Sequence, residues 1–257
     1  MVLRHACLAV LAGVALPCGA SAADWYTGAQ PAADWYTGAE PAAADASWGA
    51  AIDASAAVTS NSSAFGVVSA TIAPFGPLDR SGARIRLQGL AGVYTYPSQG
   101  GKRVQGQQEE GSGMVGYEWI WQQAALAGYI GFNVRSNSLS IADPNNPVQG
   151  TGVGLKTALD FYAQPSTRTM VAAYGSYSTL FHAYYARLRA GYMVTDGVYV
   201  GPEVTFLGDD YFNQWRVGGH LTGFSVGPVK LSLGAGYVYD RIQKSGYYTS
   251  VEARSLF

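Results

Sequence analysis

YYTSVEARSLF, residues 247–257, ends the chain and alternates between two chemically different faces. Successive side chains of a β-strand point to opposite sides, so Tyr247, Val251 and Phe257 share one face, and Glu252 and Arg254 share the other. The closing strand of a bacterial transmembrane β-barrel has this pattern, because one face contacts lipid and the other meets a polar lumen. The stretch therefore predicts the closing strand of an antiparallel transmembrane β-barrel, with Phe257 in the signal that the outer-membrane barrel assembly machinery reads.

The composition agrees with a barrel and excludes a helical membrane protein. Hydrophobic residues form 48% of the 257 residues and charged residues only 13%, and this charged share is about half that of an average globular protein. Beyond the N-terminus no apolar run approaches the roughly 18 residues that a spanning helix needs, so a membrane-embedded chain must form a closed sheet. The net charge of -1 provides no basic excess for a nucleic-acid partner.

Residues 1–23 have the pattern of a secretory signal peptide. Arg4 precedes an apolar stretch, and the small residues Ala20 and Ala22 flank the position expected before cleavage. Both cysteines, Cys7 and Cys18, fall in this segment. The mature chain would therefore carry no thiol for a disulfide or a cysteine-ligated metal.

Residues 24–47 contain a tandem repeat, DWYTGAQPAA at 24–33 and DWYTGAEPAA at 34–43. Ala and Pro dominate both copies, so the segment cannot bury enough apolar surface to fold and is expected to be a flexible periplasmic tail. The two Trp-Tyr pairs have two interpretations: short aromatic anchors for a periplasmic partner or a glycan, or a duplication without a role of its own.

Residues 48–257 have the two-residue periodicity of strands and form the predicted barrel domain. In residues 83–94, for example, Ile85 and Leu87 alternate with Arg84 and Arg86. Twelve strands are predicted, over or within residues 48–58, 65–73, 83–94, 112–121, 124–134, 152–162, 169–178, 183–194, 198–207, 215–221, 229–239 and 247–257.

The connections between these strands alternate in length. Bacterial barrels have long outer loops and short periplasmic turns, so the odd-numbered connections should be extracellular. The two longest predicted connections, residues 95–111 and 135–151, are both odd. The even ones are turn-like, except for the middle-sized stretch at residues 74–82.

Charged side chains are predicted on the inner face of the barrel, and on balance they are basic. The cations are Arg84, Arg86, Lys156, Arg187, Arg189, Arg216, Lys230 and Arg254, and the anions are Asp53, Glu118, Asp160, Glu203 and Glu252. One interpretation is a binding track for ions or for an anionic or hydroxyl-rich oligosaccharide, since arginine makes bidentate contacts. The other is a ladder of ion pairs that fills the lumen of a twelve-stranded barrel, whose width lies between a filled core and an open pore.

A barrel-type lipid-modifying enzyme is a further alternative. His220 and Thr222 share one strand face, and His182 lies in a short connection, but no orienting carboxylate stands at a defined spacing from either histidine. The sequence therefore predicts no catalytic residue, no metal site and no cofactor.

Two long motifs carry a family resemblance: residues 174–192, YGSYSTLFHAYYARLRAGY, and residues 200–223, VGPEVTFLGDDYFNQWRVGGHLTG, preceded by ADPNNPVQGTGVGLK at 142–156. With them the chain resembles the cellulose biosynthesis protein BcsS family. The resemblance implies an outer-membrane barrel that is an accessory of cellulose or exopolysaccharide synthesis, acting in secretion or surface anchoring. Its partners would be outer-membrane lipid, the assembly machinery, the glycan and components of the synthesis system. A narrow oligosaccharide or general porin is the alternative, and the family brings no site residues.

Overall fold

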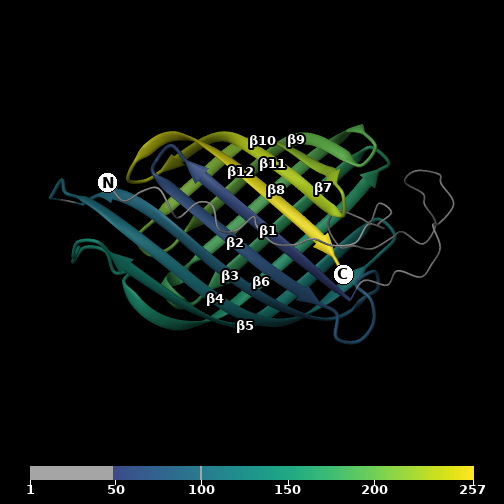
Figure 1. Cartoon of the computed structure of the whole chain (residues 1–257), viewed down its shortest axis with the longest axis horizontal. Coiled ribbons are helices and arrows are strands. Elements are labelled where there is room, and N and C mark those ends of the chain that lie inside the picture. The colour runs from purple at the N-terminus through teal and green to yellow at the C-terminus, as the bar shows by residue number, and fades with distance from the viewer. Residues whose placement is uncertain (1–48, 99) are drawn as a thin grey trace.

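The first and last strands of the described chain are hydrogen-bonded to each other and close a ring of twelve antiparallel strands (Figure 1). The computed structural model describes residues 49–98 and 100–257. The predicted signal peptide, the repeat-containing tail and Trp48 lie outside these residues. The strands are β1 (Ala50–Thr59), β2 (Ser63–Ile72), β3 (Gly82–Pro97), β4 (Arg103–Ile120), β5 (Ala124–Leu139), β6 (Gly150–Ser166), β7 (Thr169–Ser178), β8 (Tyr184–Thr195), β9 (Val198–Gly208), β10 (Asn213–Val226), β11 (Val229–Asp240) and β12 (Lys244–Leu256).

The predicted closing strand pairs with β1 as expected from the sequence. Ala51 lies opposite Leu256, and Asp53 lies opposite Arg254. The terminal Phe257 continues the ladder, because its backbone N–H donates to the carbonyl of Ala50 at 2.8 Å and its carbonyl accepts from the N–H of Gly49 at 2.7 Å. The fold prediction of a twelve-stranded antiparallel barrel is therefore confirmed.

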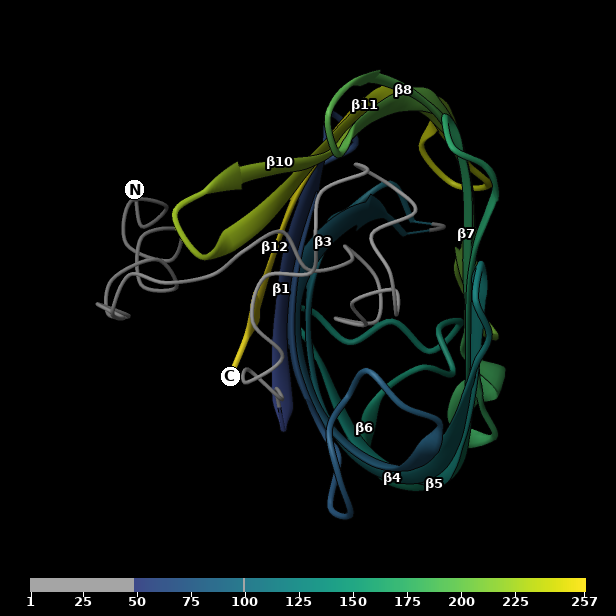
Figure 2. The same cartoon turned by 90° about the vertical axis from the view of Figure 1, so that its right-hand side faces the viewer.

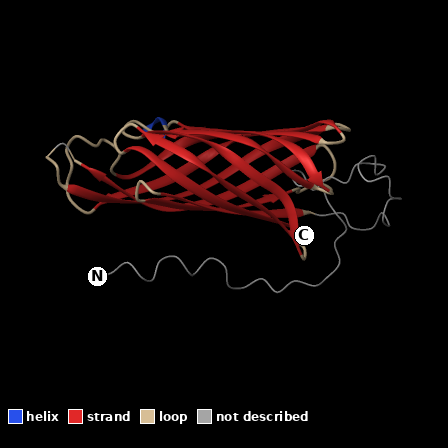
Figure 3. Ribbon diagram, turned by 90° about the horizontal axis from the view of Figure 1, so that it is seen from above, coloured by secondary structure: helices blue, strands red, loops and turns tan. Residues whose placement is uncertain are grey.

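One wall of the barrel is taller than the rest. Strands β3, β4, β5 and β6 have 16, 18, 16 and 17 residues, whereas β1, β2 and β7 have 10 each. The extra length lies at the end that carries the odd-numbered connections, the end away from the C-terminus in Figure 1. Figure 3 shows that strands make up nearly all of the described chain and that the loops lie at the two ends.

This tall wall corrects two predicted loops. Residues 95–97 and 103–111 are strand, so the third connection is only residues 98–102. The fifth connection is residues 140–149 rather than 135–151. Glycine and glutamine in residues 105–113 hid the alternation, because neither marks an apolar face, although the backbone pairs without a break with β3 and β5.

The two ends of the barrel differ in their connections. We call the end with the odd-numbered connections the outer mouth and the end near the described termini the inner mouth. The inner mouth has the turns 167–168, 196–197 and 227–228, but its connection at 73–81 is among the longest in the described chain. The outer mouth includes the loop 140–149 and a short 3-10 helix, η1 (Leu180–His182).

The outer surface is apolar at mid-height and the inner surface is polar. Leu87, Val115 and Phe132 point outward with 53, 60 and 65% of their surface exposed, as lipid-facing positions require. Viewed along its long axis the ring is oval (Figure 2). No helix among the described residues has the length and hydrophobicity needed to cross a membrane.

Candidate functional site

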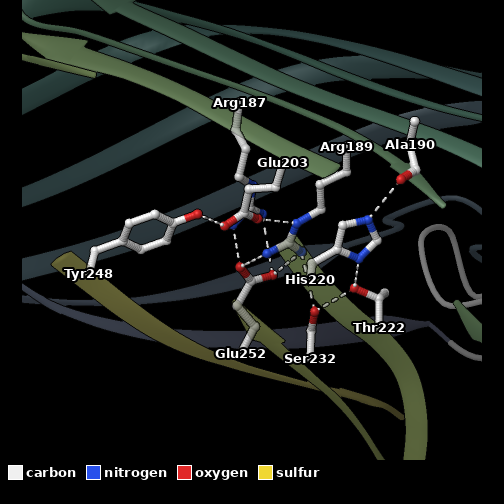
Figure 4. Close-up of polar contacts among 9 residues, drawn as sticks. All are labelled: Arg187, Arg189, Ala190, Glu203, His220, Thr222, Ser232, Tyr248 and Glu252. Atoms are coloured by element: carbon white, nitrogen blue, oxygen red, sulfur yellow. Dashed lines mark hydrogen bonds and ion pairs between the residues drawn. The ribbon is translucent and has the colours of Figure 1, made fainter. Parts of the chain in front are cut away.

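Four charged side chains from three strands meet on the inner face of the β8–β12 side of the barrel (Figure 4). Of these strands β8 and β9 are neighbours, whereas β10 and β11 lie between β9 and β12. Arg187 and Arg189 lie on β8, Glu203 on β9 and Glu252 on β12. Arg189 donates through Nε to Glu203 at 2.5 Å and through Nη2 to Glu252 at 2.8 Å. Arg187 is ion-paired to the same Glu252. We call these four residues the arginine–glutamate cluster; because each arginine is paired, its charges are balanced within the wall.

Neighbouring residues hold this cluster in place. The hydroxyl of Tyr248 donates to Glu203 at 2.9 Å. Gly218 leaves room for the Tyr248 hydroxyl, because a Cβ added at Gly218 would be 2.7 Å from that hydroxyl and 2.1 Å from the carbonyl oxygen of Ala235. Replacing this glycine would therefore move the tyrosine or the strand beside it.

A chain of hydrogen bonds leads from the cluster to His220. Arg189 donates to Ser232 at 3.3 Å, Ser232 is 2.6 Å from Thr222, and Thr222 is 2.8 Å from Nδ1 of His220. Nε2 of His220 is 3.1 Å from the carbonyl of Ala190, which can only accept. Since arginine can only donate, the chain is satisfied when both hydroxyls donate onward to a neutral His220 that carries its proton on Nε2.

His220, Thr222 and Ser232 are almost completely shielded from solvent, with 3, 0 and 0% of their surface exposed. Both ring nitrogens of His220 have partners within the wall. A histidine in this position orients the strands around it and has no free nitrogen with which to accept a proton from a substrate. This arrangement supports a structural role for the pair of residues that the sequence offered as a catalytic alternative.

The opposite wall holds two further ion pairs. Nη1 of Arg86 on β3 lies 2.5 Å from Asp160 on β6, and the guanidinium stacks on the ring of Tyr129 at 4.0 Å. Lys156 on β6 donates to Glu110 on β4 at 2.6 Å. These contacts join strands that are not neighbours in the sheet, so they tie the wall together across the lumen.

Charged residues also close part of the inner mouth. Arg84 is 1% exposed, forms an ion pair with Glu118 at 2.7 Å and donates to the carbonyl of Leu78 in the 73–81 connection at 3.2 Å. Arg254 lies 3.4 Å from Asp53. Lys230 pairs with Arg254 in the strand register and therefore shares its inner face.

The outer mouth is bridged by loops. Arg135 on β5 forms an ion pair with Asp209 in the connection 209–212 at 2.8 Å. The hydroxyl of Tyr96 on β3 donates to Asp143 at 3.0 Å, and its ring lies 5.2 Å from that of Tyr211. Burial raises the pKa of Tyr211, and the nearby carboxylate of Asp143 raises it further. The hydroxyl thus remains a hydrogen-bond donor in this closure.

A cavity of about 370 Å³ remains between these walls, within the size range of sites for small molecules. Its lining includes Arg216, whose Nε donates to Gln214 at 2.8 Å and whose guanidinium lies 5.5 Å from the ring of Tyr248. No carboxylate of the described chain lies within ion-pair distance of Arg216. Its guanidinium is therefore the group in this cavity best able to bind an anionic or hydroxyl-rich solute.

All thirteen charged residues predicted on the inner face of the barrel lie on that face. The anions Asp53, Glu118, Asp160 and Glu252 line the cavity. Arg86, Lys156, Arg187, Glu203, Arg216 and Arg254 line the cavity itself, whereas Arg84 and Arg189 are buried in the wall and Lys230 shares the inner face with Arg254.

Three charged residues of the lumen and its outer mouth were not predicted. Glu110 and Arg135 were expected in loops but lie in β4 and β5, whereas Asp209 lies in a connection, as expected from the sequence. The available signal for Glu110 and Arg135 was the two-residue period of a strand, which puts Glu110 on the inner face with Gln108 and Arg135 on the inner face with Asn133. These residues change the expected charge balance, since they add two anions and one cation. They also form ion pairs, Glu110 with Lys156 and Arg135 with Asp209, so the predicted basic excess of the lumen is smaller than expected. Among the residues that the structure describes, no group of three His, Cys, Asp or Glu side chains could hold a metal ion.

The chain matches a known protein family, and its fold is similar to those of solved outer-membrane proteins. Residues 48–257 match the protein family described as cellulose biosynthesis protein BcsS. The fold is similar to the COG4313 outer membrane channel from Pseudomonas putida F1, with a TM-score of 0.54 and 10% identity over 85% of this chain and 100% of that one. It is also similar to the transport unit of the autotransporter AIDA-I from Escherichia coli, with a TM-score of 0.51 and 8% identity over 86% of this chain and 94% of that one. No curated protein sequence matches the chain. At such identities the two structures establish the outer-membrane channel fold and nothing about the cargo.

Proposed function

Because the chain belongs to the cellulose biosynthesis protein BcsS family, we propose that it is an outer-membrane accessory that anchors cellulose or a related exopolysaccharide at the cell surface. In this proposal the barrel holds its position through contact with outer-membrane lipid and works beside the synthesis components, without catalysing a reaction. Anchoring and secretion are both compatible with the family, and the arrangement of the lumen favours anchoring.

The observation that carries the proposal is the closure of the outer mouth. Tyr96 and the 209–212 connection belong to opposite sides of the ring, yet the rings of Tyr96 and Tyr211 lie 5.2 Å apart. The ion pair of Arg135 with Asp209 spans the same mouth. A glucan chain moving lengthwise through the barrel would have to break these contacts.

The lumen below the mouth is also poorly suited to a neutral polymer. Separating the partners of a buried ion pair destabilises a protein by about 3–5 kcal/mol. Arg189 and Glu203, with side chains 4 and 2% exposed, form such a pair. Hydroxyl groups of an uncharged glucan would replace charge-assisted hydrogen bonds with weaker neutral ones. A sealed barrel therefore agrees with the chemistry of the lumen better than a conduit does.

The tall wall supplies a surface for the glycan. Above the apolar band, the outward positions of β4, β5 and β6 become polar; they include Gln105, Gln107, Ser136, Ser138 and Thr151. Amide and hydroxyl side chains in two adjoining rows can donate to and accept from sugar hydroxyls. This surface lies outside the lumen, so glycan could attach to it without entering the barrel.

The test is the fate of cellulose in cells that lack this protein. If the barrel anchors the polymer, deletion should leave the total amount of extracellular cellulose unchanged and raise the fraction released into the medium. If the barrel is a conduit, extracellular cellulose should fall and polymer should accumulate in the periplasm. The second result would refute the proposal.

A narrow oligosaccharide channel is the second candidate, and the cavity lined by Arg216 favours it. Purified barrel in liposomes distinguishes the two. An anchor should give no swelling with cello-oligosaccharides of any length, whereas a channel should admit the short ones and exclude the long ones.

A further inference from the structure

Four basic side chains gather on one sector of the outer mouth, above β12, β1, β2 and β3. Lys102 and Arg103 lie at the β3–β4 turn, and Arg241 and Lys244 lie at the β11–β12 turn; all four are exposed. We call them the basic rim. We propose that the basic rim binds the phosphate groups of a phosphorylated glycolipid in the outer leaflet of the membrane.

Hydrogen bonds hold the turns of the basic rim together. The turn at residues 60–62 lies between the two basic turns. Its Ser62 accepts from Arg103 at 3.1 Å, and the side chain of its Asn61 donates to the carbonyl of Lys244 at 3.2 Å. The side chain of Gln243 reaches further and donates to the carbonyl of Thr95 on β3. Three adjacent turns thus form one connected edge, so the four cations are presented together.

The positive charge of the rim is not neutralised by the protein. Within the described chain, none of the four forms an ion pair with a carboxylate. Asp240 is close in sequence but is 1% exposed and accepts from Asn61 at 2.9 Å. Glu109, which faces outward on β4, marks where the basic sector ends. The nearest acidic side chains in the neighbouring 209–212 connection already have cationic or imidazole partners, since Asp209 pairs with Arg135 and Asp210 with His182.

The surface directly below the rim suits acyl chains. Val58, Val93 and Tyr247 point outward there, with 50, 39 and 75% of their surface exposed. The outward positions between them are small; they are Ala56, Ala64, Gly66 and Ala91. Small side chains leave a shallow, even surface that lipid chains can cover, and Tyr247 has the ring and hydroxyl typical of the membrane interface.

A ligand that binds both the basic rim and the apolar surface below it must carry phosphate groups and acyl chains, and is therefore amphipathic. Basic side chains near an anionic membrane surface attract it by electrostatic forces that salt weakens. A soluble phosphate compound would use the rim but not the apolar surface, and a second protein would not require phosphate. The combination therefore favours a membrane glycolipid, and the inference does not depend on the proposed anchoring role.

Binding of purified full-length protein in detergent to diphosphorylated lipid A tests the proposal. Dephosphorylated lipid A and inorganic phosphate serve as the two comparison probes. The double variant Arg241→Ala/Lys244→Ala should bind diphosphorylated lipid A roughly 30-fold more weakly at low salt, since each basic residue contributes about 1 kcal/mol. The matched control removes two exposed cations at the inner mouth, Arg80→Ala/Arg168→Ala, and should bind as the wild type does.

Three results would overturn the proposal. The first is equal binding of phosphorylated and dephosphorylated lipid. The second is an equal loss of binding in the rim and control variants. The third is salt-sensitive self-association of the protein that the rim variant abolishes without any effect on lipid binding, which would assign the rim to a second copy of the chain. Heat-dependent gel mobility of each variant shows whether it is folded before binding is measured.

Discussion

Substituting Arg189 with methionine tests whether the arginine–glutamate cluster is a structural element or a track for solutes. Methionine keeps much of the arginine stem and removes the guanidinium. The side chain of Arg189 is 4% exposed and bridges Glu203 and Glu252. In the variant, Glu252 retains Arg187, but Glu203 loses its cation and retains only the hydroxyl of Tyr248.

The expected loss follows from this burial. An uncompensated charge in a buried pair costs about 3–5 kcal/mol of unfolding free energy. Because the side chain of Glu203 is only 2% exposed, solvent screening should lower this cost only slightly. Arg187→Met should cost less, about 1–2 kcal/mol, because the Arg187 side chain is 25% exposed and Glu252 keeps Arg189 as its partner. Arg189→Met should therefore lose more unfolding free energy than Arg187→Met, and this order tests the burial argument as well as either value does.

Urea titration of the purified barrel measures both effects, with tryptophan fluorescence and heat-dependent gel mobility as probes. The shift of the midpoint, multiplied by the slope of the transition, gives the change in unfolding free energy. The double variant Arg189→Met/Glu203→Gln should regain at least about 1 kcal/mol relative to Arg189→Met, because the unpaired carboxylate is gone.

A structural role for Arg189 is refuted if Arg189→Met changes the unfolding free energy by less than about 0.5 kcal/mol and alters the ion selectivity of the reconstituted barrel. That result would mean that Arg189 meets solutes and is not held in the wall.

Three further outcomes are expected. Gly218→Ala should destabilise the barrel by about 1–3 kcal/mol in the same urea assay, because the added Cβ would lie 2.1 Å from a carbonyl oxygen. The control Gly219→Ala should be close to neutral, since its nearest contact would be 3.5 Å away. Equal effects of the two variants would contradict the packing argument. Arg135→Ala should raise single-channel current by releasing the outer mouth, and an unchanged current would show that this ion pair does not close it. Leu159→Arg should cost about 2–4 kcal/mol on the lipid face, while Ser138→Arg above the apolar band should be tolerated; similar costs would place the membrane differently.

The strand order and the inward or outward direction of most side chains could be predicted from the sequence. In a closed antiparallel sheet, successive strands pair with each other and the side-chain period is two, so alternation alone assigns Ile85 to lipid and Arg86 to the lumen. Where alternation was masked, the prediction was wrong. Residues 105–113 contain mostly glycine, glutamine and glutamate, and they form strand because β3 and β5 supply hydrogen-bond partners on both sides.

The pairing of charges could not be predicted in the same way. Alternation says that Arg86 and Asp160 point inward, but their contact joins β3 to β6 across two intervening strands. It depends on the width and oval section of the barrel, which no local pattern encodes. The closure by Tyr96 and Tyr211 depends likewise on how the 209–212 connection folds over the mouth to reach the end of β3.

The sequence by itself determined that residues 247–257 close a barrel and which of their side chains face lipid, because strand periodicity and lipid contact act residue by residue along one strand. Only the tertiary structure decided that the inner residues of that strand belong to an ion-paired wall. Glu252 is held by Arg187 and Arg189 from β8, and charge neutralisation in a buried site requires partners that the chain brings together only when the ring is complete.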